Sequence, residues 1–319
     1  MSKKKRNSQP SGRDKAKNTV IPLPKDTKGI ASNFFVSQGN TGLLYDKYFR
    51  YGIKPNKDDL QELVKTVSNP PKEHKIVLQR RKEFLEEEEG YYNFIAQTES
   101  RMICGIGGPS AIDVGFFFHP LYGFPIIPGS SIKGLCNHYF RESFQKQLKC
   151  YPIWHRLLFG HESSNKEDDE LAGGIIFHDA WLAAKQKKWI YTDVMTSHYH
   201  DYYEKGWAPS GNSQTNPISF LSVRTGTRFE FWIKSNLRSP YLEKCQPHFD
   251  AMLADLQNFY VRNNMLTKAQ TLYTLDIDIL EKCLEDMIRV ILKKALACWG
   301  IGAKTGSGYG YMGAVGENS

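Results

Sequence analysis

The 319-residue sequence lacks the long apolar segment of a transmembrane helix. No run approaches the roughly 20 apolar residues that cross a bilayer, and no hydrophobic stretch follows the N-terminal charges, as it does in a secretory signal. We therefore expect no membrane association, no export and a cytoplasmic location. The 40% hydrophobic and 13% aromatic content is enough for one large core or two modest ones.

Cysteine is scarce, and its spacing excludes two classes of stabilised domain. The six cysteines are scattered, form no C-x-x-C pair and mostly stand among apolar neighbours. Because zinc sites and secreted disulfide frameworks need regular cysteine spacing, we expect neither structural zinc nor disulfides. Asp193, His198, His200 and Asp201 lie close together in the sequence but match no full set of ligand spacings, so the prediction is no metal and no cofactor.

Most of the chain also lacks an excess of positive charge. Residues 1–30 hold nine Lys or Arg and two Asp, a net charge of +7 out of +8 for the whole chain. Their Ser, Asn, Pro and Lys content is typical of a disordered arm, which either attracts RNA or DNA without regard to sequence or simply solvates the protein. Any nucleic-acid site in residues 31–319 must therefore be a local patch.

Glycine, in contrast, is concentrated near the C-terminus. The segment Trp299–Met312, WGIGAKTGSGYGYM, holds five glycines in fourteen residues and follows an amphipathic pattern that predicts a long helix. Glycine lets a backbone approach a neighbour closely, and its amides suit a phosphate group. The candidate contacts with a phosphodiester backbone are Gly302, Lys304, Thr305, Gly306, Ser307 and Gly308. A flexible helix-to-strand turn without a ligand is the alternative.

Neither of two nucleotide-binding motifs fits this glycine loop. A Walker A motif requires glycine before Lys-Ser/Thr, whereas Ala303 precedes Lys304 and Thr305. A dinucleotide fingerprint follows a strand and opens a helix, whereas this loop follows a helix. Nucleotide hydrolysis and Rossmann chemistry are therefore disfavoured.

A second motif marks the start of an internal helix. In Leu121–Phe140, LYGFPIIPGSSIKGLCNHYF, a Pro-Gly turn precedes apolar residues at helical spacing, so we expect a helix that begins near Ser131 with Ser130 as its N-cap. Backbone N–H groups at a helix start bind anions. Ser130, Ser131 and Lys133 are therefore candidate anion contacts, with an ordinary capped helix as the alternative.

The remaining patterns indicate an α+β architecture, because helices and strands alternate irregularly. We expect helices over 58–68, 72–89 and 249–260, strands over 92–105 and 174–181, and a hairpin of 218–223 with 227–233 around Thr225 and Gly226. Arg101, a basic residue of the first strand, is a further candidate RNA contact. Asp113 lies in the loop that follows this strand.

Several spaced motifs together resemble the RAMP superfamily of CRISPR effector subunits. They are VGFFFHPLYGFPIIPGSSIKG, FHDAW, DVMTSHYHDYY, PISFLSVRTGTRFEF and GIGAKTGSGYGYM, in this order between Arg101 and Met312. The set is similar in particular to the sixth-subunit family of the type III-B (Cmr) complex. The resemblance implies a modified ferredoxin-like or RRM fold with insertions. We expect a single domain over 31–319 with an N-terminal helical extension at about 31–90. No motif of the family aligns with residues 1–90, and whether they form part of the core or a partner-binding extension stays open.

The resemblance also implies a function in antiviral defence. A subunit of this family is expected to bind RNA without catalysis and to cap the backbone filament of a ribonucleoprotein near the 3′ end of its guide. The implied partners are crRNA, target RNA, the repeated backbone subunit, the small helical subunit and the other terminal RAMP subunit. The helix-start motif and the glycine loop would hold guide phosphates, and Lys205–Pro217, with Trp207, would be a hairpin that wedges between bases.

Two other functions stay open from the sequence. The backbone subunit of such complexes cleaves RNA with a loop aspartate, and Asp113 occupies a comparable place, although acid-base cleavage requires a positioned partner as well. The near-neutral charge of residues 31–319 also fits a protein-interaction subunit that touches no RNA.

Overall fold

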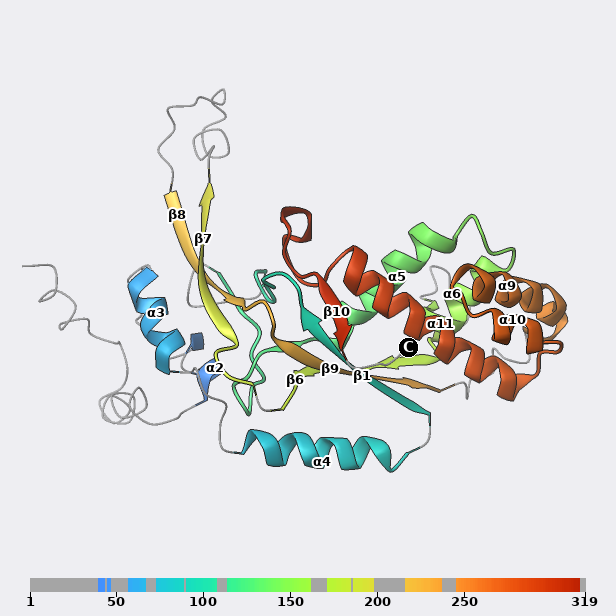
Figure 1. Ribbon diagram of the computed structural model, residues 1–319, viewed down its shortest axis with the longest axis horizontal. Helices are drawn as coiled ribbons and strands as arrows, with labels where there is room; N and C mark the ends of the chain where they lie inside the picture. The colour runs from blue at the N-terminus through green and yellow to red at the C-terminus, as the bar shows by residue number, and fades with distance from the viewer. Residues whose placement is uncertain are drawn as a thin grey trace, which may run out of the picture.

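The computed structural model describes residues 40–43, 45–46, 57–66, 73–88, 90–107, 114–161, 171–184, 186–197, 216–236 and 245–315 (Figure 1). The predicted arm at 1–30, the candidate acid Asp113 and the candidate wedge residue Trp207 lie outside these residues. The same holds for His198, His200 and Asp201. The division of the chain into an arm and a single domain therefore stays a prediction.

An antiparallel sheet forms the centre of the molecule, and its strands pair in the order β10-β1-β9-β6-β2, with β5 also paired to β9. The strands are β1 (Tyr91–Thr98), β2 (Ile126–Ile127), β5 (Ile175–Phe177), β6 (Ala180–Leu182), β9 (Arg228–Ser235) and β10 (Met312–Val315). Helix α5 (Gly129–Phe144) follows β1 in the chain, and α11 (Ile277–Cys298) follows β9. Strand β1 thus lies between β9 and the last strand, β10, and α5 and α11 are the two helical crossovers. This is the ferredoxin-like order, so the predicted α+β fold is confirmed.

The main core lies between the sheet and helices α5 and α11, which pack on the same face (Figure 1). Every second residue of β1 and β9 points toward the helices, and the rings of Phe94 and Phe231 stack there at a centroid distance of 5.1 Å. Phe94 is 6% exposed, so it is not available for stacking on a base. The buried residues of α11 recur at helical spacing, which is why the long helix was predictable.

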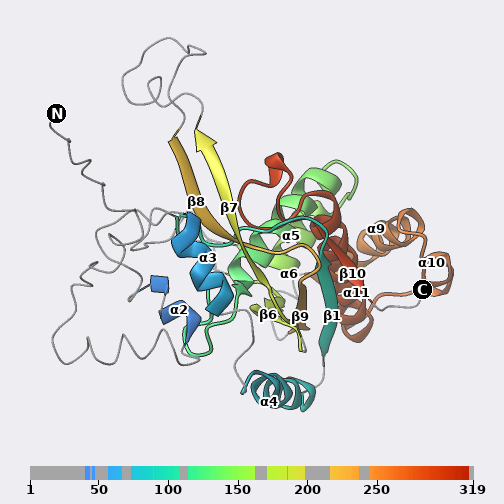
Figure 2. The same cartoon turned by 60° about the vertical axis from the view of Figure 1, so that its left-hand side comes forward.

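Helix α4 (His74–Glu86) lies on the opposite face of the sheet (Figures 1 and 2). His74, Leu78 and Leu85 form its buried stripe, and the guanidinium of Arg81 lies 4.0 Å from the ring centroid of Trp181. RRM-type sheets bind bases on such a face. Because α4 covers part of this face here, that part of the sheet is not open to a base.

Three further helices extend the α5–α11 layer away from the sheet: α6 (Tyr151–Phe159), α9 (Phe249–Arg262) and α10 (Leu266–Thr271). Asp255 of α9 is 2% exposed and joins two of them. Its carboxylate accepts hydrogen bonds from the backbone N–H groups of Lys149 and Cys150 and from the indole of Trp154. A buried carboxylate at the N-terminus of α6 is stabilised by the helix dipole, so this contact fixes α9 against α6.

The remaining described elements are short or lie outside the central sheet. They are α2 (Thr41–Leu43), α3 (Lys57–Thr66), β3 (Gly160–His161), β4 (Leu171–Ala172), β7 (Ile190–Ser197), β8 (Asn216–Val223) and the 3₁₀ turns Gln246–His248 and Thr305–Ser307. Helices α3, α4 and α9 confirm the helices expected at those positions. None of the helices in the described part of the chain is long and apolar enough to span a bilayer, and all six cysteines are free thiols.

The predicted hairpin around Thr225 and Gly226 is wrong. Strand β8 pairs with β7 in a separate two-stranded sheet, whereas β9 enters the central sheet. The cause is Thr98, fully buried at the end of β1: its hydroxyl donates to the Arg224 carbonyl at 2.7 Å and accepts from the Thr227 N–H at 2.9 Å. The turn therefore binds β1 and bridges two sheets instead of closing a hairpin.

Replacing Thr98 with Val tests this bridge. The substitution keeps the side-chain shape but removes the hydroxyl that donates to the Arg224 carbonyl and leaves the buried Thr227 N–H with only its longer 3.3 Å bond to that carbonyl, so the free energy of unfolding should fall by about 1–3 kcal/mol. Urea denaturation followed by circular dichroism measures the change. Thr192→Val is the matched control, because the Thr192 hydroxyl is buried and makes no hydrogen bond within the described residues; it should be neutral or stabilising. Equal losses at both positions would contradict the assigned role of Thr98.

Candidate nucleic-acid interface

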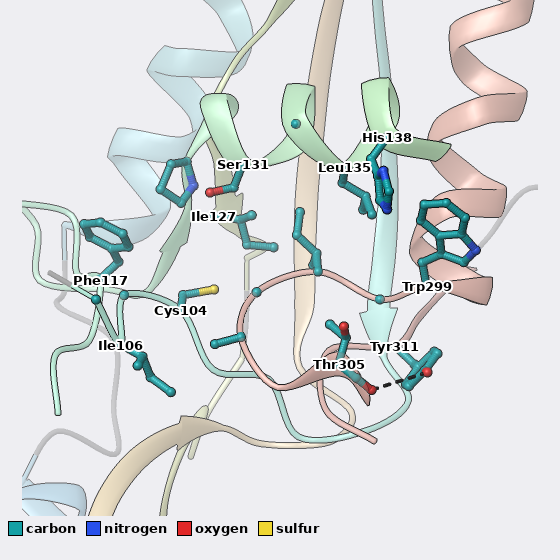
Figure 3. A pocket seen from close by; sticks show the side chains of 18 of the residues that line it. Cys104, Ile106, Phe117, Ile127, Ser131, Leu135, His138, Trp299, Thr305 and Tyr311 are labelled. Atoms are coloured by element: carbon teal, nitrogen blue, oxygen red, sulfur yellow. Dashed lines mark hydrogen bonds between the residues drawn. The ribbon is translucent and has the colours of Figure 1, made fainter. Parts of the chain in front are cut away.

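An open cleft of about 900 Å³ separates the start of α5 from the C-terminal glycine loop (Figure 3). Ser131, Gly134 and His138 recur at helical spacing on one wall, and residues 299–303 and 305–306 with Tyr311 form the other. Residues 104–107 and Phe117 also line it. The two motifs singled out from the sequence therefore face one another across a single cavity.

The glycine loop takes its shape from close backbone contacts that only glycine allows. Gly302 has a φ of +95°, and a Cβ on it would lie 2.3 Å from the carbonyl oxygen of Ile103. At Gly310, with a φ of +83°, a Cβ would lie 2.0 Å from the carbonyl oxygen of Ile301. The Ala303 N–H donates to the Ile103 carbonyl at 2.8 Å. These contacts hold the loop against the segment that follows β1.

Three other glycines around the cleft have no such structural requirement. A Cβ on Gly107, Gly134 or Gly306 would meet no atom within 4 Å, and none of the three has a positive φ. Gly134 lies inside a helix, where glycine costs about 1 kcal/mol relative to alanine. The missing side chains keep the cleft open, which suits the close approach of a ligand backbone.

The start of α5 differs in one respect from the sequence prediction. The helix begins at Gly129 with Pro128 as its N-cap, so Ser130 is an exposed residue of the first turn and the prediction of Ser130 as the cap is wrong. The carboxylate of Asp179 accepts from the Gly129 N–H at 2.7 Å and takes the capping role. Gly129 fits there because a Cβ would lie 2.2 Å from the Phe177 carbonyl oxygen.

The two predicted lysines flank the cleft instead of lining it. Among the described residues, the lining holds no lysine or arginine. Lys133 lies near His155 of α6. Burial lowers the pKa of His155, and the charges of Arg141, His161 and Lys133 lower it further. Lys304 is exposed in the glycine loop with a φ of 59°. Both lysines can attract a polyanion, but contacts inside the cleft fall to amides, hydroxyls and His138.

The predicted loop contacts divide into two groups. The N–H groups of Ser307 and Gly308 donate to the carbonyls of Lys304 and Thr305, both at 2.9 Å, and so close a turn within the loop. Thr305 and Gly306 line the cleft itself, and the carbonyl of Thr305 also accepts from the Tyr311 hydroxyl (Figure 3). Within the loop, direct contacts are therefore expected at Gly302, Thr305 and Gly306.

Arg101 lies outside the cleft lining, in a network that joins the glycine loop to β7. Its guanidinium forms an ion pair with Asp193 at 2.8 Å, and the Tyr309 hydroxyl donates to the same carboxylate oxygen at 2.8 Å. Burial and the neighbouring Asp193 raise the pKa of Tyr309. Asp193, grouped in the sequence with possible metal ligands, is thus a partner of arginine and tyrosine.

Two features of the cleft escaped the sequence prediction. His138 and Trp299 form part of the lining, with their rings 4.6 Å apart, and nothing in their local pattern separates them from ordinary surface residues. Gly105 and Gly107 also line the cleft, and their signal was the glycine repeat directly after the first strand. Within the described residues, no group of three or more His, Cys, Asp or Glu is placed to hold a metal ion.

Two curated relatives are similar to parts of the chain. The CRISPR system CMR subunit Cmr6 of Saccharolobus solfataricus is 25% identical over 144 residues, which are 44% of this chain and 44% of the relative. The Cmr6 subunit of Pyrococcus furiosus is 28% identical over 178 residues, which are 40% of this chain and 52% of the relative. The chain thus matches about half the length of each relative.

Solved structures of CRISPR proteins are also similar. A chain of the type III-B Cmr-beta complex bound to cognate target RNA has a TM-score of 0.47 and 18% identity, with 92% of this chain and 88% of that chain covered. The crystal structure of Cmr6 from Pyrococcus furiosus has a TM-score of 0.36 and 17% identity, with 70% of this chain and 97% of that chain covered. The family model of the RAMP superfamily matches residues 95–312, more than half of the sequence. The chain belongs to the RAMP superfamily.

Proposed function

We propose that this chain is a non-catalytic, RNA-binding subunit of a type III-B CRISPR effector complex. It holds crRNA in the cleft between α5 and the glycine loop and caps the backbone filament near the 3′ end of the guide, beside the target RNA. The observation that carries the proposal is the meeting of the helix-start motif and the glycine loop at one cleft. The relatives named as Cmr6 subunits support the complex in which this binding takes place.

The cleft suits the RNA backbone through close approach instead of charge. Ser131 and Thr305 offer hydroxyls from facing walls, and the side of Gly134 is open. Phosphates bind backbone amides and hydroxyls in this way at helix starts and glycine loops. Because no cation lines the cavity in the described part of the chain, the cleft itself contributes little sequence-blind affinity, and Lys133 and Lys304 supply longer-range attraction from its rim.

One observation favours a different function. A neutral cleft lined by Leu135, Trp299 and Phe117 also fits the backbone of a protein partner, which is the RNA-independent role left open by the sequence. RNA cleavage has less support: Asp113 lies outside the described residues, and a lone acid does not make a general acid-base pair. The two experiments that follow separate RNA binding from protein binding.

Replacing Gly134 with Leu fills the open side of the helix wall. We expect the affinity for guide RNA to fall by about tenfold, equivalent to the loss of one contact with a charged phosphate, while helix propensity adds about 0.5–1 kcal/mol of stability. Filter binding and thermal denaturation measure the two effects. Gln145 is an exposed neutral residue at the other end of α5, so Gln145→Leu should change neither the RNA affinity nor the stability by a comparable amount. Full RNA affinity in Gly134→Leu would show that the cleft does not hold RNA.

The second experiment separates the flanking lysines from the N-terminal arm. Each phosphate contact on single-stranded RNA contributes about 0.7 to the slope of log K against log salt, so Lys133→Ala with Lys304→Ala should lower the slope by about 1.4. Deletion of residues 1–30 should weaken guide and unrelated RNA equally. A double variant with an unchanged slope, together with a truncation that abolishes binding, would leave the folded domain without an RNA site.

A further inference from the structure

An exposed tyrosine at the base of the β7–β8 hairpin lies between two arginines. Tyr191 of β7 is 42% exposed, and the guanidinium carbons of Arg101 and Arg224 lie 5.4 Å and 5.7 Å from its ring centroid. The three residues come from separate segments: Arg101 from the segment that follows β1, Tyr191 from the start of β7 and Arg224 from the turn after β8. We call this group the Tyr191 platform.

The two arginines have different electrostatic surroundings. Arg101 pairs with Asp193 and is 43% exposed. Arg224 is exposed, and in the described part of the chain no ion pair involves it. The contacts that hold this turn are made by the backbone of Arg224, whose N–H donates to the Trp189 carbonyl and whose carbonyl accepts from Thr98. The Arg224 side chain is thus not needed for the turn and leaves a net positive charge at the platform.

The platform is preorganised by its neighbours. Asp193 lies two residues after Tyr191 on the same face of β7, and its carboxylate binds both Arg101 and Tyr309. Strand β7 is paired with β8 from Ile190 to Ser197. A second small core of Ile103, Val114 and Phe220, with Tyr309 packed against it, joins the hairpin base to the glycine loop. A ligand therefore meets groups that are already ordered.

We propose that the Tyr191 platform binds one unpaired nucleobase of single-stranded RNA by stacking on Tyr191, with the flanking phosphates held by Arg101 and Arg224. This inference rests on the proposed function, because it extends the RNA path from the cleft to the hairpin base through Asp193 and Tyr309. An exposed ring flanked by cations is the arrangement used for single-stranded nucleic acid. An acidic protein segment would use both cations but leave the ring face unused, so RNA is the occupant that engages all three residues.

The test compares Tyr191→Ala, Tyr191→Phe, Arg224→Gln and Gly134→Leu in the full chain, with a single-stranded RNA oligonucleotide as the probe. Loss of a base-stacking ring lowers affinity by about 5- to 150-fold, so Tyr191→Ala should show a loss in this range and Tyr191→Phe should restore binding. Arg224→Gln should lower the salt slope by about 0.7. The same sequence as a duplex should bind equally to wild type and Tyr191→Ala, because its bases are not free to stack.

The outcomes distinguish the platform from the cleft. If Gly134→Leu weakens RNA binding and Tyr191→Ala does not, the platform is refuted and the proposed function stands. If the wild-type chain does not bind RNA, both fail. If a poly-glutamate peptide binds wild type but not Arg224→Gln, while RNA binding is unchanged, the surface docks protein and the inference is wrong. Thermal denaturation checks the fold, and Tyr191→Leu replaces the alanine variant if that variant does not fold.

Discussion

The close approach of two backbone segments, residues 301–303 and 101–104, determines the arrangement of both the sheet and the cleft. The Ile103 carbonyl accepts from the Ala303 N–H at the place where a side chain on Gly302 would collide with it. With the loop held there, β10 pairs with β1 at the sheet edge, and Tyr309 reaches Asp193 at the base of the hairpin. Gly302 and Gly310 are thus required by the fold itself, whether or not the loop binds a ligand.

The distribution of charge has a consequence for RNA recognition. The arm at 1–30 carries almost the whole net charge, whereas no cation lines the cleft in the described part of the molecule. Under the proposed function, sequence-blind attraction and selective placement of the guide would therefore fall to different parts of the chain. Helix α4 covers sheet surface that an RRM uses for bases. Under the proposed function, RNA would therefore bind at the cleft and the hairpin base instead.

Local patterns predicted the elements that depend on local information. The apolar spacing of 277–298 and 249–260 identified α11 and α9, because each helix buries one stripe. The strand partners of β8 and the cap of α5 were not predictable, since they depend on Thr98 and Asp179, which lie 126 and 50 residues away from the groups they bind. For the same reason the sequence identified both walls of the cleft but not His138 or Trp299 within it.

The most direct measurement of the central claim is photo-crosslinking of a 4-thiouridine-substituted guide RNA in the assembled complex, followed by mass spectrometry of the crosslinked peptides. If the guide lies in the cleft, crosslinks fall in residues 129–138 of α5 and 299–311 of the glycine loop. Crosslinks confined to residues 1–30, with both of those segments unmodified, would contradict the account.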